Sequence, residues 1–378
     1  MPGAGGSYGS AGGFLHAALA LSDGSFWEGR GFGAAAAVTG EVVFNTGMIG
    51  YTQTITDCSY NGQILVQTYP LIGNYGICRS EFESTGPRIQ GYVVQEACPF
   101  PSHYTSEANI NDWLKANGVP GLQGIDTREL TKRLRTEGTM LGALQVSHEP
   151  IDRDALVEKA QKAEDPNARD LVSEVTISEP MTYPGHGRRV VVIDCGAKLG
   201  IIRSLQSLGL EVIRVPAGFT ADMIMSFRPD GVLISNGPGD PKKVPYVIQA
   251  AKALLEQRLP LFGICLGNQM LGLALGCDTY KLKFGHRGQN HPAVELRTGR
   301  CHITSQNHGF AIDRESLKGT GASASFINVN DGSVEGIVCD SLPAFGVQFH
   351  PEASPGPVET KFLFDRFVRM MEDARAKG

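Results

Sequence analysis

Two patterns of hydrophobic residues follow one another along the chain. From Phe14 to about Val146, short apolar and β-branched runs are separated by Gly, Asn and Asp, which is typical of strands joined by turns. These runs predict four strands, at Ala17–Leu21, Glu41–Asn45, Gln63–Tyr69 and Gly91–Gln95. Residues 14–149 are therefore predicted to form a mixed, β-rich N-terminal domain.

Helices are a minority in this domain, and two are predicted. The first, Ile110–Asn117, ends at Gly118, and the second, Thr127–Glu137, follows Asp126. An aspartate before the first turn accepts hydrogen bonds from backbone N–H groups that have no partner within the helix, and Glu129 completes this capping pattern.

Two segments lack a clear pattern. Residues 150–188 carry charged residues and several prolines, with a short helix near Asp154–Lys162, and they are predicted to be a connector. Residues 1–13 are mostly Gly, Ala and Ser, without Lys, Arg or a long apolar run. We interpret them as a disordered tail, because secretory and transit peptides have a different composition.

After Arg189, apolar strand runs alternate with helical patterns. Such βαβ alternation is typical of a parallel sheet covered by helices on both faces. Residues 189–378 are therefore predicted to form a doubly wound α/β domain, which binds ligands at the carboxyl ends of its strands. The predicted strands are Val190–Asp194, Glu211–Val215, Gly231–Ser235, Leu261–Ile264 and Ala344–Gln348. The predicted helices are Leu199–Leu208, Ala221–Phe227, Val244–Glu256, Leu266–Leu275 and Val358–Ala374.

Composition narrows the class of protein. A chain of 378 residues is long enough for about two domains. A formal net charge of −5 gives no electrostatic reason to expect nucleic acid, and no apolar run is long enough to predict a membrane span. The eight cysteines form no C-x-x-C pair, which disfavours a zinc site or a disulfide framework and favours a reducing, cytoplasmic compartment.

One strand-to-helix junction carries a candidate nucleophile. Residues 263–267 read G-I-C-L-G, the cysteine counterpart of the serine nucleophile elbow. The glycines leave room for a sharp turn, and the positive end of the next helix favours a Cys265 thiolate. The backbone N–H of Leu266 would face an oxyanion formed on attack. Taken alone, Cys265 would be interpreted as a small buried apolar residue.

Two further motifs change that interpretation. His350 and Glu352 follow a predicted strand, in the order that a Cys-His-Glu triad requires. Residues 235–241 read S-N-G-P-G-D-P at the end of another strand, where a glycine could offer a second oxyanion N–H. As separate features these would be a loop histidine, a solvated carboxylate and an ordinary turn. Together with Cys265 they predict a hydrolytic site.

Other motifs are weaker. G-F-G-A-A-A at residues 31–36 loosely matches a dinucleotide fingerprint, but no buried strand is predicted before it, and no G-x-x-x-x-G-K-[S/T] loop occurs. His286, His291, His302 and His308 lie close together in sequence. Because cysteine or acidic residues at ligand spacing are missing, we interpret them as polar loop residues and predict no metal site.

The motifs together resemble the triad glutamine amidotransferases, and within them the small subunit of carbamoyl-phosphate synthetase. G-I-C-L-G-N-Q at 263–269 and H-P-E at 350–352 are typical of amidotransferases in general. T-D-C-S-Y at 56–60, G-N-Y-G at 73–76 and G-I-D-T-R at 124–128 are similar to that small subunit in particular. So are G-E-V-V-F-N-T-G at 40–47, G-H-R-G at 285–288 and S-Q-N-H-G-F at 305–310. The resemblance covers nearly the whole chain from about Phe14.

This resemblance implies a mechanism and a set of residues. Cys265 would attack the side-chain amide of glutamine and form a glutamyl-thioester. His350 would protonate the departing ammonia and then activate water, while Glu352 orients the imidazole. Gly239 and Leu266 would present the oxyanion donors. The implied L-glutamine-binding residues are Ser59, Gly237, Gly239, Leu266, Gln269, Asn307, Gly309 and Phe310.

The resemblance also implies a partner. A carbamoyl-phosphate synthetase large subunit, or a fused synthetase region, would use the ammonia with bicarbonate and ATP for pyrimidine and arginine synthesis. No cofactor is expected in this chain, because ATP and Mg²⁺ would be bound by that partner. Asn268 stands where the family commonly has His, and Cys58 where it usually has Pro. We expect Asn268 to alter glutamine affinity or subunit coupling, and Cys58 to loosen the turn that aims Ser59.

Two other functions are open on the sequence. A free-standing hydrolase of γ-glutamyl compounds would use the same triad but leave the N-terminal domain without a role. A non-catalytic regulatory subunit would retain the triad as a vestige, although all three residues and both glycine loops are present. Glutamine-dependent carbamoyl phosphate formation with a synthetase subunit would exclude the first, and alkylation of Cys265 by a glutamine mimic would exclude the second.

Overall fold

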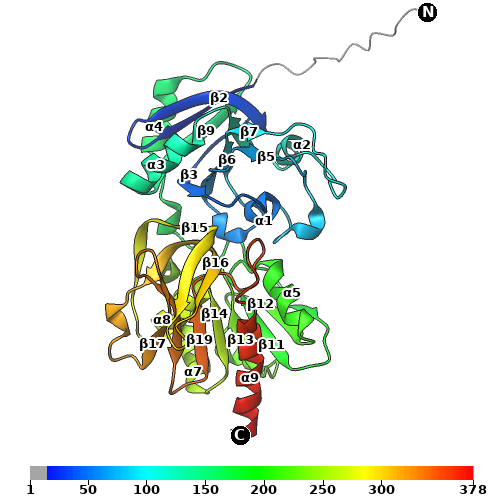
Figure 1. Ribbon diagram of the computed structural model, residues 1–378, viewed down its shortest axis with the longest axis vertical. Helices are drawn as coiled ribbons and strands as arrows, with labels where there is room; N and C mark the ends of the chain where they lie inside the picture. The colour runs from blue at the N-terminus through cyan, green and yellow to red at the C-terminus, as the bar shows by residue number, and fades with distance from the viewer. Residues whose placement is uncertain (1–14, 378) are drawn as a thin grey trace, which may run out of the picture.

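The computed structural model describes residues 15–377 and consists of two units arranged along the longest axis (Figure 1). A closed barrel forms the N-terminal unit, and an open sheet flanked by helices forms the other. The tail predicted at residues 1–13 lies outside the described residues. Within residues 15–377, no helix has both the length and the apolar character required to cross a membrane.

The barrel contains seven strands in the order β1-β2-β8-β6-β4-β3-β9. Closure pairs each strand on both sides, so the barrel has no exposed edge. The four predicted strands are confirmed as β1, β3, β4 and β6. The sequence pattern does not reveal β2, β8 and β9, because glycine interrupts each of them. The strands are β1 (His16–Leu21), β2 (Phe26–Gly33), β3 (Ala37–Asn45), β4 (Gln63–Gln67), β6 (Gly91–Val94), β8 (Pro120–Gln123) and β9 (Met140–Ser147).

Short helices surround the barrel strands. The two predicted helices are confirmed as α2 (Ile110–Ala116) and α3 (Thr127–Glu137). Asp126 accepts a hydrogen bond from the Glu129 N–H at 2.9 Å, which is the predicted cap. A further one-turn helix, α1 (Tyr51–Ile55), follows β3.

The segment predicted as a connector, residues 150–188, belongs partly to each unit. Helix α4 (Arg153–Gln161) buries Leu156 and Ala160 against the barrel strands β1 and β9. Near the other end of the segment, β10 (Met181–Tyr183) pairs with the edge of the second sheet. Only the chain between these two elements passes from one unit to the other.

The second unit confirms the predicted doubly wound α/β fold. Five parallel strands lie in the order β12-β11-β13-β14-β19 within a ten-stranded sheet. Alternate residues of β11 enter opposite cores, with Val191 packing towards α7 and α8 and Val190 towards α5 and α9. The parallel strands are β11 (Arg189–Asp194), β12 (Glu211–Pro216), β13 (Gly231–Ile234), β14 (Leu261–Ile264) and β19 (Ala344–Val347). The helices are α5 (Leu199–Ser207), α6 (Ala221–Met225), α7 (Pro245–Glu256), α8 (Leu266–Ala274) and α9 (Phe362–Lys377).

Antiparallel strands extend this sheet, and the sequence pattern does not reveal them. The prediction that four histidines lie in loops is wrong, because His286 and His291 lie on β15 and His302 and His308 on β16. Polar residues fill the middle of both strands, which form a pocket wall and not an apolar core. The added strands are β15 (Thr279–Glu295), β16 (Cys301–Ile312), β17 (Ala322–Asn328) and β18 (Val334–Cys339).

Candidate active site

The candidate nucleophile stands on the turn between β14 and α8. Cys265 has φ 54° and ψ −106°, a conformation in which residues other than glycine are strained. A Cβ on Gly263 would lie 2.5 Å from the Gly267 carbonyl oxygen, and one on Gly267 would lie 2.0 Å from the Ile234 carbonyl oxygen. The G-x-C-x-G spacing is therefore a steric requirement of the turn.

The structure brings the predicted triad residues together. His350 and Glu352 lie on the loop after β19, which is the parallel neighbour of β14. His350 Nδ1 lies 2.7 Å from Glu352 Oε1, and the nearby Cys265 thiol contributes to the raised pKa of His350. The other ring nitrogen, His350 Nε2, is buried and has no hydrogen-bond partner in the described part of the chain. This nitrogen is therefore available to exchange a proton with substrate.

The charges around His350 favour its protonated form. Burial alone would lower the pKa of His350, but the Glu352 carboxylate outweighs burial and the pKa rises to about 10. Burial would raise the pKa of Glu352, yet Lys198 and then His350 hold it well below its usual range. Lys198 Nζ lies 2.8 Å from Glu352 Oε1, and both side chains are buried. At neutral pH the imidazole therefore carries the proton that a departing amine needs.

A small cavity lies beside Cys265, at the junction of the two units. All eight residues predicted to bind glutamine line it, namely Ser59, Gly237, Gly239, Leu266, Gln269, Asn307, Gly309 and Phe310. The rest of the wall comprises Glu41, Gln63, Asn167, Lys281, Arg287 and His308. The space between them is about 30 Å³, which is about the share of one water molecule in the liquid. The predicted glutamine site is therefore formed by residues of both units.

Asp57 connects the barrel to the rest of the pocket through hydrogen bonds. Its carboxylate accepts hydrogen bonds from the Ser59 N–H at 2.9 Å, Asn236 Nδ2 at 3.3 Å and Asn307 Nδ2 at 3.0 Å. Asn236 Nδ2 also lies 3.0 Å from Ser59 Oγ. One buried carboxylate thus joins the turn that contains Cys58, the loop after β13 and strand β16.

The motifs do not single out Lys198, Asp57 or Asn236, although each lies within or beside a recognisable segment. Lys198 follows the end of β11, Asp57 is two residues before Ser59, and Asn236 belongs to the S-N-G-P-G-D-P loop. Position at a strand's carboxyl end is the signal that could have found Lys198 and Asn236. Their partners come from distant parts of the chain, so the roles emerge only in three dimensions.

Asn268, which stands where the family commonly has His, lies outside the pocket wall. Its side chain is fully buried, and a Cβ on Gly346 would lie 2.5 Å from Asn268 Oδ1. Neither Oδ1 nor Nδ2 has a hydrogen-bond partner within residues 15–377. Any influence of Asn268 on glutamine affinity must therefore be indirect, through the way its buried side chain supports the adjacent wall residue Gln269.

His286, His308 and Glu335 form a buried group whose ligand atoms lie within 4.8 Å of one another. Both ring nitrogens of His308 already have partners, since Nδ1 lies 2.8 Å from the Phe310 carbonyl oxygen and Nε2 3.0 Å from Gln306 Oε1. A metal ion would have to displace one of them. The geometry therefore favours a hydrogen-bonded cluster, and the lack of a metal stays a prediction.

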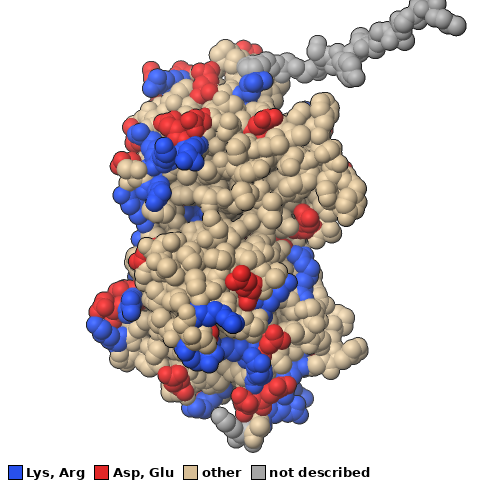
Figure 2. Space-filling model, viewed as in Figure 1, with Lys and Arg blue, Asp and Glu red and all other residues tan. Residues whose placement is uncertain are grey.

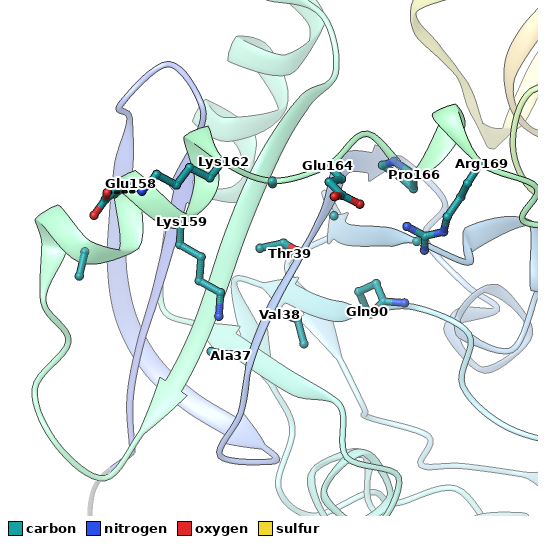
Figure 3. A pocket seen from close by; sticks show the side chains of 14 residues that line it. Ala37, Val38, Thr39, Gln90, Glu158, Lys159, Lys162, Glu164, Pro166 and Arg169 are labelled. Carbon is teal, nitrogen blue, oxygen red and sulfur yellow. Dashed lines mark hydrogen bonds and ion pairs between the residues drawn. The ribbon is translucent and has the colours of Figure 1, made fainter.

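A larger hollow, of about 720 Å³, lies between α4 and β3 (Figure 3). Side chains of both charges line it, including Lys159, Lys162 and Arg169 with Glu158 and Glu164. It contains no residue of the triad. We therefore place the candidate site at the smaller cavity, whose wall contains the nucleophile Cys265.

Comparison with known proteins shows the family to which the chain belongs. Residues 19–144 match the family described as "Carbamoyl-phosphate synthase small chain, CPSase domain", and residues 191–370 match "Glutamine amidotransferase class-I". The chain is 48% identical to the carbamoyl phosphate synthase small chain of Bacillus caldolyticus, over 95% of this chain and 98% of that protein. It is also 48% identical to the small chain of Listeria monocytogenes serotype 4b, over 93% and 96% of the two chains. It is 47% identical to the pyrimidine-specific small chain of Bacillus subtilis, over 95% and 97%. The chain therefore belongs to the carbamoyl phosphate synthase small chain family and carries a class-I glutamine amidotransferase domain.

Proposed function

We propose that the chain is the glutaminase subunit of a carbamoyl-phosphate synthetase, which hydrolyses L-glutamine and delivers ammonia to a synthetase partner. The observation that carries the proposal is the buried set of Cys265, His350 and Glu352 beside a small cavity. A nucleophile, a base and an orienting carboxylate are the groups that amide hydrolysis needs.

In the first step, the Cys265 sulfur attacks the side-chain carbonyl carbon of glutamine. The resulting oxyanion would be stabilised by the backbone N–H groups of Leu266 and Gly239, both in the cavity wall. The C–N bond then breaks, and His350 gives its proton to the nitrogen, which leaves as ammonia. The products of this step are ammonia and a glutamyl-thioester on Cys265.

In the second step, water hydrolyses the thioester. The imidazole of His350, now neutral, takes a proton from water as the oxygen attacks, and the C–S bond breaks. Glutamate is released, and the Cys265 thiolate and the protonated imidazole of His350 are regenerated for the next cycle. Glu352 holds the ring by its Nδ1 atom throughout, while Lys198 keeps that carboxylate charged.

The ammonia would be used by a large subunit or a fused synthetase region that binds ATP and Mg²⁺ and makes carbamoyl phosphate from bicarbonate. The barrel unit supports a docking role, since its loops expose Met48, Ile49, Phe100 and Tyr104. Figure 2 shows few charged side chains over the part of the barrel unit that carries α2. Exposed apolar surface of this kind is typical of protein contact sites.

The test is ammonia release from L-glutamine by the purified chain, alone and with a synthetase subunit supplied with bicarbonate, Mg²⁺ and ATP. We expect slow release alone, faster release with the partner, and glutamine-dependent carbamoyl phosphate in the complex. Cys265→Ala should lower glutamine hydrolysis by about 1000-fold or more, while its complex still uses free ammonia.

Cys277→Ala is the matched control for this substitution. Cys277 is also buried, burial raises its pKa, and it lies outside the cavity, so its loss should leave hydrolysis near the wild-type rate. Equal activity of Cys265→Ala and wild type would refute the triad. Hydrolysis that no synthetase subunit accelerates or couples would instead favour the free-standing hydrolase.

A further inference from the structure

Arg287 is a buried guanidinium in the wall of the cavity beside Cys265, and it is 4% exposed. Its only side-chain hydrogen bond within residues 15–377 joins Nη1 to the Phe284 carbonyl oxygen at 2.7 Å. Nε is buried and has no partner among those residues. Burying a cation whose donors are not all satisfied is unfavourable, so the position of this charge requires an explanation.

The surroundings hold the guanidinium in one place. A Cβ on Gly285 would lie 2.5 Å from Nη1, so glycine is required there for Arg287 to fit. Nη2 lies beside Gly309, 3.3 Å from the place of a Cβ, and Gly309 is one of the predicted glutamine-binding residues. The Arg287 carbonyl oxygen accepts a hydrogen bond from the Thr46 N–H at 3.2 Å, which fixes this part of β15 to the barrel.

The nearby acidic side chain does not pair with Arg287. Glu41 is the carboxylate whose charge acts on the guanidinium, but no ion pair within 4 Å joins the two in the described part of the chain. Glu41 is instead bound to Lys281 Nζ at 2.8 Å, Thr139 Oγ1 at 2.9 Å and Gln63 Nε2 at 3.0 Å. Lys281 therefore balances Glu41, and Arg287 is left without an anion of its own.

We infer that Arg287 binds the α-carboxylate of L-glutamine and selects for substrates that carry this group. The inference rests on the proposed glutaminase function. Glutamine carries its α-carboxylate at the end opposite to the amide that Cys265 attacks, so an anchor for it belongs in the same cavity. Guanidinium–carboxylate contacts are strong, charge-assisted hydrogen bonds, and the burial of Arg287 strengthens them. Arg287 thus joins the eight predicted glutamine-binding residues as a specificity determinant.

The test compares L-glutamine with its α-amide, in which a neutral group replaces the α-carboxylate. Ammonia release from each compound is measured for wild type and for Arg287→Gln, which removes the charge but keeps much of the side-chain volume. We expect Arg287→Gln to raise KM for L-glutamine by about 10- to 100-fold, with kcat nearly unchanged. The preference for L-glutamine over its α-amide should fall by the same factor, because the α-amide cannot form the ion pair.

Lys242→Gln is the matched control, since it removes a charge of the same sign from a residue outside the cavity wall. Lys242 is 46% exposed and already paired with Asp278, so we expect the preference for L-glutamine over its α-amide to change by less than about fivefold. The rate at which iodoacetamide alkylates Cys265 should be equal in wild type and Arg287→Gln, which shows an intact nucleophile. Equal losses for both substrates, or an unchanged KM for L-glutamine, would overturn the role of Arg287. If wild type releases ammonia from neither compound, the proposed glutaminase function itself fails.

Discussion

At the scale of single residues, the site depends on buried charges that compensate one another. Burial would lower the pKa of Lys198, but Glu352 and then Glu83 raise it well above its usual range. Glu352 in turn keeps His350 protonated. Each group is charged because its neighbour is charged, so the loss of one leaves another buried without a full set of partners.

Lys198→Met tests this dependence. The substitution keeps an unbranched side chain but removes the ammonium, so Glu352 is left with His350 as its one charged partner. We expect the free energy of unfolding at pH 7, measured by urea titration, to fall by about 3 kcal/mol. The double variant Lys198→Met, Glu352→Gln removes both charges and should recover part of that loss. A single variant as stable as wild type would contradict a strong Lys198–Glu352 pair.

At the scale of elements, polar contacts hold the β15–β16 hairpin against β18. His286 Nε2 on β15 lies 2.8 Å from Asp331 Oδ2, just before β18, and Nδ1 lies 3.4 Å from Glu335 Oε1 on β18. Burial alone would lower the pKa of His286, but these carboxylates raise it to about 9. His291 and His308 also face this imidazole, and burial lowers the pKa of each, so both are neutral near pH 7.

Stability should therefore fall as pH rises through the range in which His286 titrates. A folded-state pKa of about 9, above the unfolded value of 6.5, means that its contribution is complete below pH 6.5 and lost by about pH 9. Asp331 is 44% exposed, so solvent reduces the effect to about 2 kcal/mol. Urea titrations at pH 6.5 and 9 should show wild type losing more stability than His286→Gln. Parallel losses in the two proteins would show that His286 is not the titrating group.

At the scale of the whole molecule, the active site exists only where the barrel and the sheet meet. Ser59 and Asp57 come from the barrel, whereas Cys265 and Asn307 come from the other unit. Glu83, from the barrel unit, forms a further contact between the two units, beside the loop that carries Glu352. Its buried carboxylate accepts hydrogen bonds from the Gly200 N–H at 2.8 Å and Ser354 Oγ at 2.7 Å, and it pairs with Arg203.

Glu83→Ala should weaken the junction of the two units. It leaves the Gly200 N–H, the Ser354 hydroxyl and the Arg203 guanidinium without this carboxylate, so we expect a loss of about 3 kcal/mol in the free energy of unfolding. Calorimetry should show a lower transition temperature for Glu83→Ala. Arg79→Ala is the control, because Arg79 lies close to Glu83 in sequence and forms an exposed ion pair with Glu107. This variant should change the free energy of unfolding by less than about 1 kcal/mol. Similar shifts in both variants would mean that Glu83 has no special role at the junction.

The local features of this protein follow from its sequence alone. Cys265, between Gly263 and Gly267, could be assigned to an elbow because the turn excludes side chains on steric grounds that involve near neighbours. The helices other than α1 and the five parallel strands of the second unit were predictable to within four residues, because apolar periodicity and capping depend on adjacent residues. His350 and Glu352 followed from their place after a strand.

Which charges are buried, and what they contact, depends on how the whole chain folds. The barrel closure pairs β1 with β9, which are far apart in sequence. The glycine-containing strands of the barrel and the polar strands of the β15–β16 hairpin lack the apolar alternation that would reveal them. Lys198, Asp57 and Arg287 are ordinary polar residues until folding removes them from water. Burial then makes every charge costly unless a partner is near, and those partners come from elements that the chain brings together only when both units are folded.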